Sequence, residues 1–245
     1  MFEALGWGIL AASSLVVGEV IAAYVRVPRR ILGLILAFGV GVLISAVSFE
    51  LVDEAFRSAN SSWTVSGGLL AGSLVFFGGD QLIGRMGSRR HKKQGAAEPR
   101  RDNSGAAILL GTVLDGIPES IVIGLTLVKG GAVSAAMVVA VFLSNLPEAI
   151  GATSGLRAEG WKRWQTMGLW LAVALASGVA SLAGFAFFDT ADPHVLAFTL
   201  SFAAGALLTM LADSMMPEAY RDSGPFAGMI TVLGFCLAYA ISALT

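Results

Sequence analysis

The chain alternates between long apolar runs and short polar stretches. Eight of the runs reach the roughly 18–20 residues that a helix needs to cross the hydrocarbon core of a bilayer. They predict membrane-spanning helices at residues 5–25, 31–52, 65–86, 106–128, 132–156, 167–188, 195–216 and 226–244. The connections are short, except for residues 87–105 between the third and the fourth run. We therefore expect an all-α polytopic membrane protein with one transmembrane domain over residues 1–245.

The composition excludes a soluble globular domain, because the chain is 56% hydrophobic, only 13% charged and has a mean hydropathy of +0.76. The single cysteine, Cys236, excludes an internal disulfide and a paired-cysteine metal site. No basic segment precedes the first apolar run, which is long enough to span. We expect this run to be a retained helix rather than a cleaved signal peptide.

Lysine and arginine lie almost entirely on one side of the predicted membrane. Fourteen of the 16 lie beside the inner ends of the runs, whereas Arg57 and Lys129 lie on the other side. By the positive-inside rule the fourteen face the cytoplasm, which places both termini outside and residues 87–105 inside. The basic stretch 88–93 has one histidine and no aromatic residue, so it predicts an anchor near anionic membrane lipid rather than a nucleic-acid site.

The second and seventh runs resemble each other. Residues 37–56 align without gaps to residues 201–220. Because these two runs cross the membrane in opposite directions, the match predicts an inverted repeat in which three helices, a central pair and three further helices follow one another. The paired residues are Phe38 with Phe202, Gly41 with Gly205, Leu43 with Leu207, Ser45 with Thr209, Glu54 with Glu218, and Phe56 with Tyr220.

Polar segments at residues 115–119 and 144–148 interrupt the fourth and fifth runs, and each ends in Pro-Glu. A helical rise of about 1.5 Å per residue places their polar side chains within roughly 8 Å of one another in membrane depth. Carboxylates at this depth are costly and mark substrate or ion paths, and a divalent cation exchanged against protons would neutralise them. The candidate ligands are Asp115, Glu119, Ser144, Asn145 and Glu148.

Further acidic residues lie near the ends of the second and seventh runs. They are either entrance and exit relays for the central site or polar helix ends that reach water. The outer group is Glu50, Asp53 and Glu54, and the inner group is Asp213 and Glu218.

The paired Pro-Glu segments, the eight runs and the cytoplasmic loop after the third resemble the Zrt/Irt-like (ZIP) family of divalent metal transporters. The stretch 202–206, which leads to Pro217-Glu218, is similar to bacterial members of that family. The resemblance extends over essentially the whole chain and implies a transporter, not an enzyme, in the inner or plasma membrane. Its substrate would be Zn²⁺ or a similar cation such as Fe²⁺ or Mn²⁺, moved into the cytoplasm without an organic cofactor. Dimers are common in the family, so a homodimer is also implied.

The chain departs from the family pattern at its central motifs. Asp115 stands where the family has a metal-binding histidine, and Gly116 where it has an asparagine that binds a second metal. The sixth run contains no acid, so the resemblance implies one metal per transport cycle. The implied primary site is Asp115, Glu119 and Glu148, with Ser144 contributing. An all-oxygen site is harder than one with imidazole, which reduces the advantage of zinc over Mn²⁺, Fe²⁺, Mg²⁺ or Ca²⁺.

Two alternatives use the same acids. In the first, Asp115 and Glu119 are protonated, are hydrogen-bonded to Ser144 and Asn145, and only hold helices together; a degenerate family member that binds metal without moving it belongs partly to this alternative. A proton-coupled carrier of a small organic cation would need a roomier pocket with aromatic walls, and the central runs contain Phe142 but neither tryptophan nor tyrosine.

An intramembrane aspartyl protease is a third alternative. It would use Asp80, which follows two glycines, together with Asp115. This reading leaves the two Pro-Glu motifs without a role.

Overall fold

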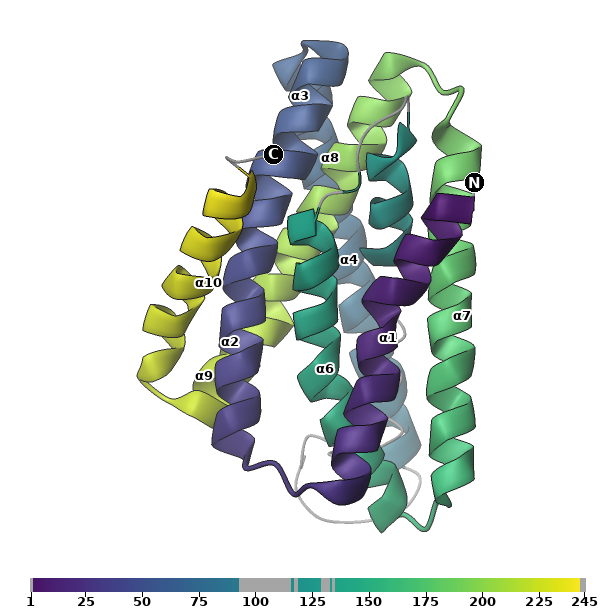
Figure 1. Ribbon diagram of the computed structural model, residues 1–245. Coiled ribbons are helices and arrows are strands. Elements are labelled where there is room, and N and C mark those ends of the chain that lie inside the picture. Colours follow the sequence, from purple (N-terminus) through teal and green to yellow (C-terminus); the bar gives the residue numbers. More distant parts are fainter. Residues whose placement is uncertain (1, 93–115, 117–118, 129–132, 134, 243–245) are drawn as a thin grey trace.

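The computed structural model describes residues 2–92, 116, 119–128, 133 and 135–242, with only the backbone described at 80 and 82–92. Within these residues every regular element is a helix, so the predicted all-α class is confirmed for this part of the chain (Figure 1). In the part of the chain that the structure describes, five helical stretches are long and apolar enough to cross a membrane, as expected for a polytopic membrane protein. They are Phe2–Tyr24, Arg29–Ala59, Ala135–Ala158, Arg163–Phe188 and Pro193–Ser223.

The described helices lie along seven of the eight predicted runs and along part of the fourth. In chain order they are α1 (Phe2–Tyr24), α2 (Arg29–Ala46), η1 (Val47–Val52), α3 (Asp53–Ala59), α4 (Ser62–Lys92), α6 (Ala135–Ala158), α7 (Arg163–Phe188), α8 (Pro193–Met210), η3 (Leu211–Met215), α9 (Met216–Ser223) and α10 (Phe226–Ser242). Of the predicted fourth span, residues 119–126 are described as helical, and 106–115 lie outside the described residues. The loop 87–105 is described only as far as residue 92, where α4 ends.

Two π-helical turns interrupt the long helices that correspond to the second and seventh runs, and the sequence analysis did not predict them. η1 joins α2 to α3, and η3 joins α8 to α9. They begin at Val47 and Leu211, which are equivalent positions in the gap-free alignment of residues 37–56 with 201–220. A π-turn holds one extra residue, so it changes the direction in which the following side chains point.

Glycines at equivalent positions bring these long helices close to their neighbours. A Cβ atom at Gly41 of α2 would overlap the carbonyl oxygen of Thr231 in α10, and one at Gly205 of α8 would overlap that of Leu69 in α4. In the reverse direction, Gly234 of α10 abuts the carbonyl of Phe38, and Gly72 of α4 abuts that of Phe202. Gly41 and Gly205, and likewise Phe38 and Phe202, are pairs of the sequence alignment. The contact between α2 and α10 is therefore repeated between α8 and α4.

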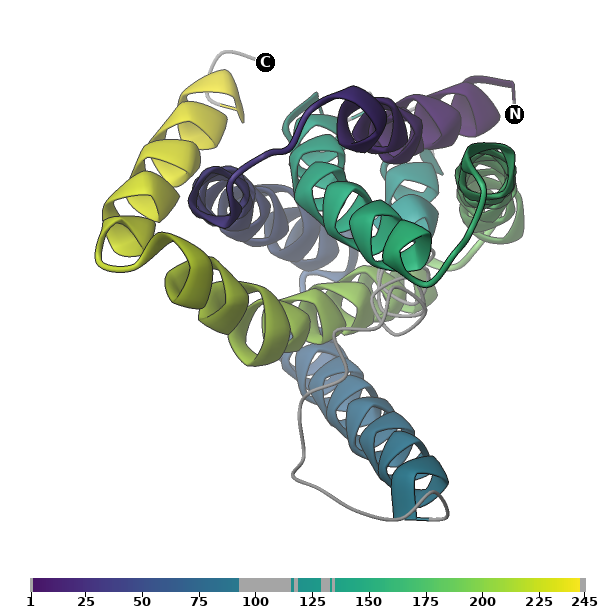
Figure 2. The same ribbon diagram turned by 90° about the horizontal axis from the view of Figure 1, so that it is seen from below.

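The remaining helices form a second group around α1, which packs on both α6 and α7. Gly18 of α1 lies against Ala149 of α6, and the fully buried Trp170 of α7 donates a hydrogen bond from Nε1 to Thr153 Oγ1 of α6 (2.8 Å). The segment 119–126 joins this group, because Gly124 abuts the carbonyl of Ser181 in α7. Seen from below, α1, α6 and α7 lie together, and α4 leaves the bundle obliquely (Figure 2).

Candidate metal site

The described part of the fourth span contributes a buried carboxylate to the interior. Glu119 and Ser120 are each 1% exposed, at the start of the helical segment 119–126. The Ser120 hydroxyl donates a hydrogen bond to the carbonyl oxygen of Gly116 (2.6 Å), one helical turn earlier. This bond satisfies the serine within its own helix and leaves Glu119 as the acidic group of the segment. Asp115, the first predicted ligand, lies outside the described residues, as does Pro118.

The fifth span brings the second set of polar side chains. Ser144 and Asn145 of α6 are 1% and 2% exposed, and Glu148 is half-buried. Ser144 donates its hydroxyl proton to the carbonyl oxygen of Val141 (3.1 Å). The helix continues through Pro147, so this proline does not break it. Because proline has no amide proton, the carbonyl of Leu143 lacks the donor that residue 147 would otherwise supply.

The two sets meet at Gly116. A Cβ atom at this glycine would lie 3.9 Å from Oδ1 of Asn145, which places the asparagine side chain beside the helix that carries Glu119. Residues three apart share one face of a helix, so Gly116 and Glu119 belong to the same face. On its other side α6 is covered by α2, because a Cβ atom at Gly39 would lie 3.3 Å from the backbone nitrogen of Ser144. The structure therefore brings Asn145 to the helix of Glu119.

The arrangement can offer oxygen ligands to a cation. Buried carboxylates and an amide among apolar helices are expensive unless hydrogen bonds or a cation satisfy them. Within the described residues no three acidic, histidine or cysteine side chains gather closely enough to hold a metal ion. The three-carboxylate site predicted from the sequence includes Asp115, so the described residues supply two of its carboxylates, from Glu119 and Glu148.

The three outer acids differ in the interactions that they make with the described residues. Glu50 sits in the π-turn η1, and its Oε2 is buried without a hydrogen-bond partner among the described residues. Asp53 forms an ion pair with Arg57 (2.7 Å), and Glu54 accepts a hydrogen bond from the Ser58 hydroxyl (3.3 Å). Asp53 and Glu54 thus interact along the helix surface, whereas Glu50 is oriented partly into the protein.

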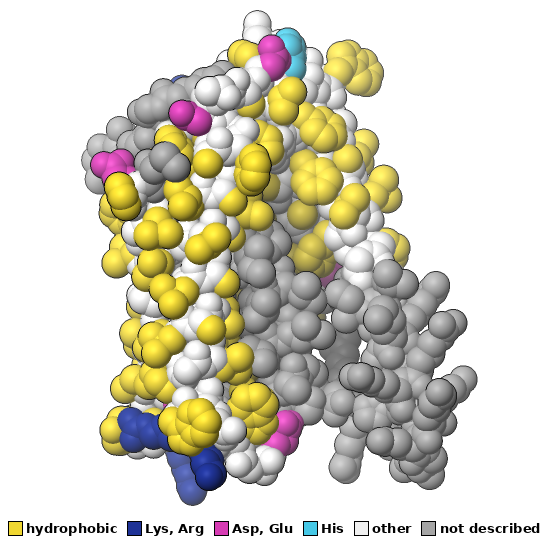
Figure 3. Space-filling model, turned by 90° about the vertical axis from the view of Figure 1, so that its right-hand side faces the viewer, with side chains coloured by type: hydrophobic (Ala, Val, Ile, Leu, Met, Phe, Trp, Pro, Cys, Tyr) yellow, Lys and Arg dark blue, Asp and Glu magenta, His cyan; other side chains and the backbone are white. Residues whose placement is uncertain are grey.

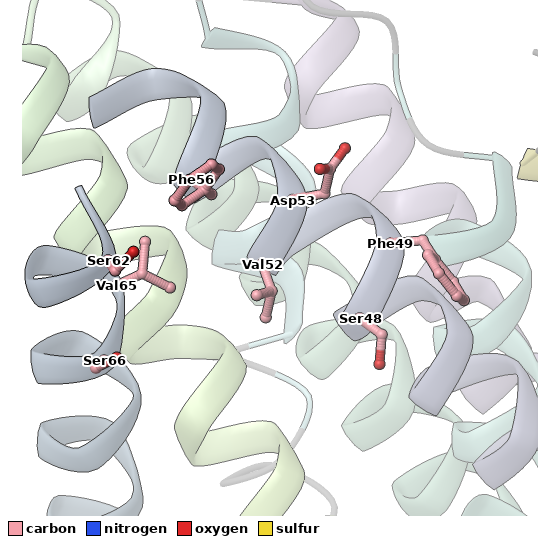
Figure 4. Close-up of a pocket in the computed structure, with 8 residues that line it drawn as sticks. All are labelled: Ser48, Phe49, Val52, Asp53, Phe56, Ser62, Val65 and Ser66. Carbon is pink, nitrogen blue, oxygen red and sulfur yellow. The ribbon is translucent and has the colours of Figure 1, made fainter. Parts of the chain in front are cut away.

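An open hollow of about 450 Å³ lies beside these outer acids (Figure 4). η1 and α3 line one side of it and the start of α4 lines the other, with four apolar side chains, three serines and Asp53. The lining residues are Ser48, Phe49, Val52, Asp53, Phe56, Ser62, Val65 and Ser66.

The inner acids are exposed at the opposite end of the repeat. Asp213 lies in η3 and is exposed, and Glu218 of α9 is paired with Arg221 at 3.0 Å. Among the described residues neither makes a hydrogen bond or ion pair with the central segments, so their role as exit relays stays a prediction.

A buried ion pair was missed in the sequence analysis. Glu19 of α1 has no exposed surface, and its Oε1 accepts hydrogen bonds from the Arg157 guanidinium of α6 and the Thr166 hydroxyl of α7 (3.0 Å). The available signal was an acid within an apolar run and an arginine at the inner end of another. The cluster joins α1, α6 and α7 at one point.

No protein-family model matches the chain. The chain is 24% identical over 212 residues to an Arabidopsis thaliana protein described as a "putative zinc transporter". The alignment covers 85% of this chain and 33% of that relative, so the chain spans about a third of the relative's length.

Proposed function

We propose that this protein carries a divalent metal ion across a membrane. The ion is Zn²⁺ or a similar cation such as Fe²⁺ or Mn²⁺. The observation that carries the proposal is the meeting of Gly116 with Asn145, because it joins two buried polar segments that each bear a glutamate. The similarity to a plant protein described as a zinc transporter supports a metal as the substrate. Membership of the ZIP family is part of the proposal.

The proposed ligands are oxygen atoms of Asp115, Glu119, Ser144, Asn145 and Glu148. Zinc accepts carboxylates, and Mn²⁺ and Fe²⁺ bind oxygen-rich sites as well. A carboxylate must lose its proton to bind, so metal entry releases protons and metal release takes them up. The site therefore couples metal movement to protonation in a region where unneutralised charge is costly.

The proposed architecture has eight spans with both termini outside, built as an inverted repeat around the central pair. The equivalent glycine contacts of α2 with α10 and of α8 with α4 support the repeat, as do the equivalent positions of η1 and η3. One helix group would then move against the other as a rigid body and expose the site to each side in turn. The moving group would contain α1, α6, α7 and the segment 119–126.

The metal would enter from the outside near Glu50, Asp53 and Glu54 and leave toward the cytoplasm near Asp213 and Glu218. The hollow beside η1, which Asp53 helps to line, supports this entrance. The proposed location is the inner or plasma membrane.

The experiment is metal uptake into proteoliposomes, across a panel of Zn²⁺, Fe²⁺, Mn²⁺, Mg²⁺ and Ca²⁺. Glu119→Gln and Glu148→Gln keep side-chain size but remove the charge, so both are expected to reduce uptake to the level of protein-free liposomes. Asp189→Asn, at the exposed end of α7, is the matched control and should transport like the native protein. Uptake that is equal in all four proteins would remove the central segments from the mechanism. Metal binding without uptake by the native protein would identify a degenerate carrier instead.

A further inference from the structure

The basic side chains described in the structure divide into two groups. Arg57, Arg157 and Arg221 each lie within 4 Å of a carboxylate. The other five have no carboxylate at that distance among the described residues, and all are exposed at the end of the bundle where α1 ends and α2 and α7 begin. These five are Arg26, Arg29, Arg30, Lys162 and Arg163.

Three of these cations lie at helix starts, where they do not stabilise the helix that carries them. Arg29 and Arg30 begin α2, and Arg163 begins α7. The first turn of a helix carries a partial positive charge, so cations are disfavoured there. Five like charges at one end of the molecule also repel one another. An anion from outside the chain would relieve both costs.

Exposed aromatic side chains lie beside two of these five cations, Lys162 and Arg163. Trp161 and Trp164 flank Lys162 and Arg163 in the sequence and are 39% and 71% exposed. Arg163 donates a hydrogen bond to the hydroxyl of Tyr24 (2.6 Å), and its Cζ lies 4.4 Å from the centre of that ring. This contact joins the end of α1 to the start of α7 and holds the guanidinium in place. Tryptophan and tyrosine with basic residues are typical of the membrane–water interface.

An apolar surface continues from this cluster along α7. Leu171, Leu175 and Val179 are 48%, 59% and 59% exposed, at intervals of four residues, so they form one stripe on the helix. On the face that includes α7, lysine and arginine side chains gather at the lower end, beneath a column of hydrophobic side chains (Figure 3). A ligand that fits both surfaces has a negative head and an apolar tail.

We propose that the basic–aromatic cluster of Tyr24, Arg26, Trp161, Lys162, Arg163 and Trp164 binds the headgroup of an anionic phospholipid. Its phosphate pairs with the Lys162 and Arg163 side chains, and its acyl chains lie along the exposed stripe of α7. The lipid then links the ends of α1 and α7. A soluble anion would use the charges but would leave the tryptophans and the adjoining apolar stripe without a role. This inference does not depend on metal transport.

The test measures the melting temperature of the purified full-length chain in a neutral detergent while phosphatidylglycerol is titrated into the micelles. Phosphatidylglycerol should raise the melting temperature, and phosphatidylcholine should not. Each cation near an anionic lipid surface contributes about fivefold in affinity, so Lys162→Gln/Arg163→Gln should need roughly 30-fold more phosphatidylglycerol for the same shift. Arg57→Gln, at the other end of the molecule, should respond like the native chain. Lys162→Arg/Arg163→Lys keeps both charges and should restore most of the response.

Three results would overturn the proposal. They are an equal shift with phosphatidylcholine, an unchanged midpoint in Lys162→Gln/Arg163→Gln, and full competition by inorganic phosphate, which would indicate a site for free anions. If the double variant is unstable without lipid, Arg26→Gln provides the same comparison, because Arg26 makes no hydrogen bond or ion pair with the described residues. A right-shifted titration for Arg26→Gln supports the proposal, and an unchanged one contradicts it.

Discussion

Glu19 is a carboxylate without exposed surface in an apolar helix, and its partners determine what its replacement costs. Arg157 and Thr166 both donate to its Oε1. Removing one member of a buried pair leaves the other charge unneutralised, whereas removing both leaves only a packing change.

We therefore expect Arg157→Leu to lower the free energy of unfolding by about 3 kcal/mol, at the low end for a buried pair because a quarter of the Arg157 side chain is exposed. Glu19→Leu/Arg157→Leu should cost less than Arg157→Leu alone. Denaturation in mixed micelles of the native chain, both single variants and the double variant gives the coupling energy. If the two single effects simply add, the charges do not stabilise each other.

The central carboxylates should also make metal binding depend on pH. Protons compete with metal for Glu119 and Glu148, so metal affinity should fall as the pH is lowered from about 7 to about 4, where glutamate side chains ordinarily take up protons. Isothermal titration with Zn²⁺ across this range measures the effect. An affinity that does not change with pH would indicate that metal binds elsewhere or without these acids.

At the scale of helices, the glycines between neighbouring elements control how closely they approach. Gly41 and Gly205 occupy equivalent positions in the α2–α10 and α8–α4 contacts, and an added methyl group would meet a backbone carbonyl in both. Backbone cannot move aside as the end of a side chain can, so helices must separate.

Gly41→Ala and Gly205→Ala should therefore each lower the free energy of unfolding by about 1–3 kcal/mol, as overpacking does in a close-packed interior. Gly228→Ala in α10 is the control, because a Cβ atom there meets nothing within 4 Å. It should be neutral or stabilising by up to about 1 kcal/mol, since alanine favours helices more than glycine. Thermal unfolding in detergent compares the three, and a large difference between Gly41→Ala and Gly205→Ala would argue against equivalent packing.

The apolar runs predicted the helices well because hydrophobic length is encoded directly in the sequence. The short turn between the fourth and fifth runs predicted that these spans are neighbours, but it did not determine that Asn145 faces the fourth span. The π-turns were not predicted, because Val47 and Leu211 lie within apolar stretches whose composition is the same in either type of helix. Nor was the pairing of Glu19 with Arg157, which depends on how α1 and α6 are rotated against each other. Asp115 stays a prediction, since it lies outside the described residues.

At the scale of the whole molecule, the proposed movement places α6 and α2 in different groups that touch at Gly39. A Cβ atom at Gly39 would lie 3.5 Å from the Cβ atom of Leu143, which suits a disulfide, where this distance is about 3.5–4.5 Å. A bond between these positions would prevent the groups from sliding past each other.

We expect Gly39→Cys/Leu143→Cys, made in a Cys236→Ser background, to lose metal uptake after oxidation and to regain it after reduction. Metal binding should survive in the oxidised protein, because the bond adds no charge to the site. Leu143→Cys alone, treated with the same oxidant, controls for side reactions. Uptake by the fully cross-linked protein would show that α2 and α6 do not need to move apart.

The two π-turns also bear on the origin of the chain. One extra residue in a helix turns everything beyond it by about 100°, and a chance insertion at the equivalent place in two separate helices is improbable. If the halves of the molecule descend from one ancestral gene that was duplicated, the insertion was already present before the copy was made. Proteins that preserve the undoubled ancestor, as half-length chains that pair with themselves, should therefore carry the same single-residue insertion near the end of their second helix.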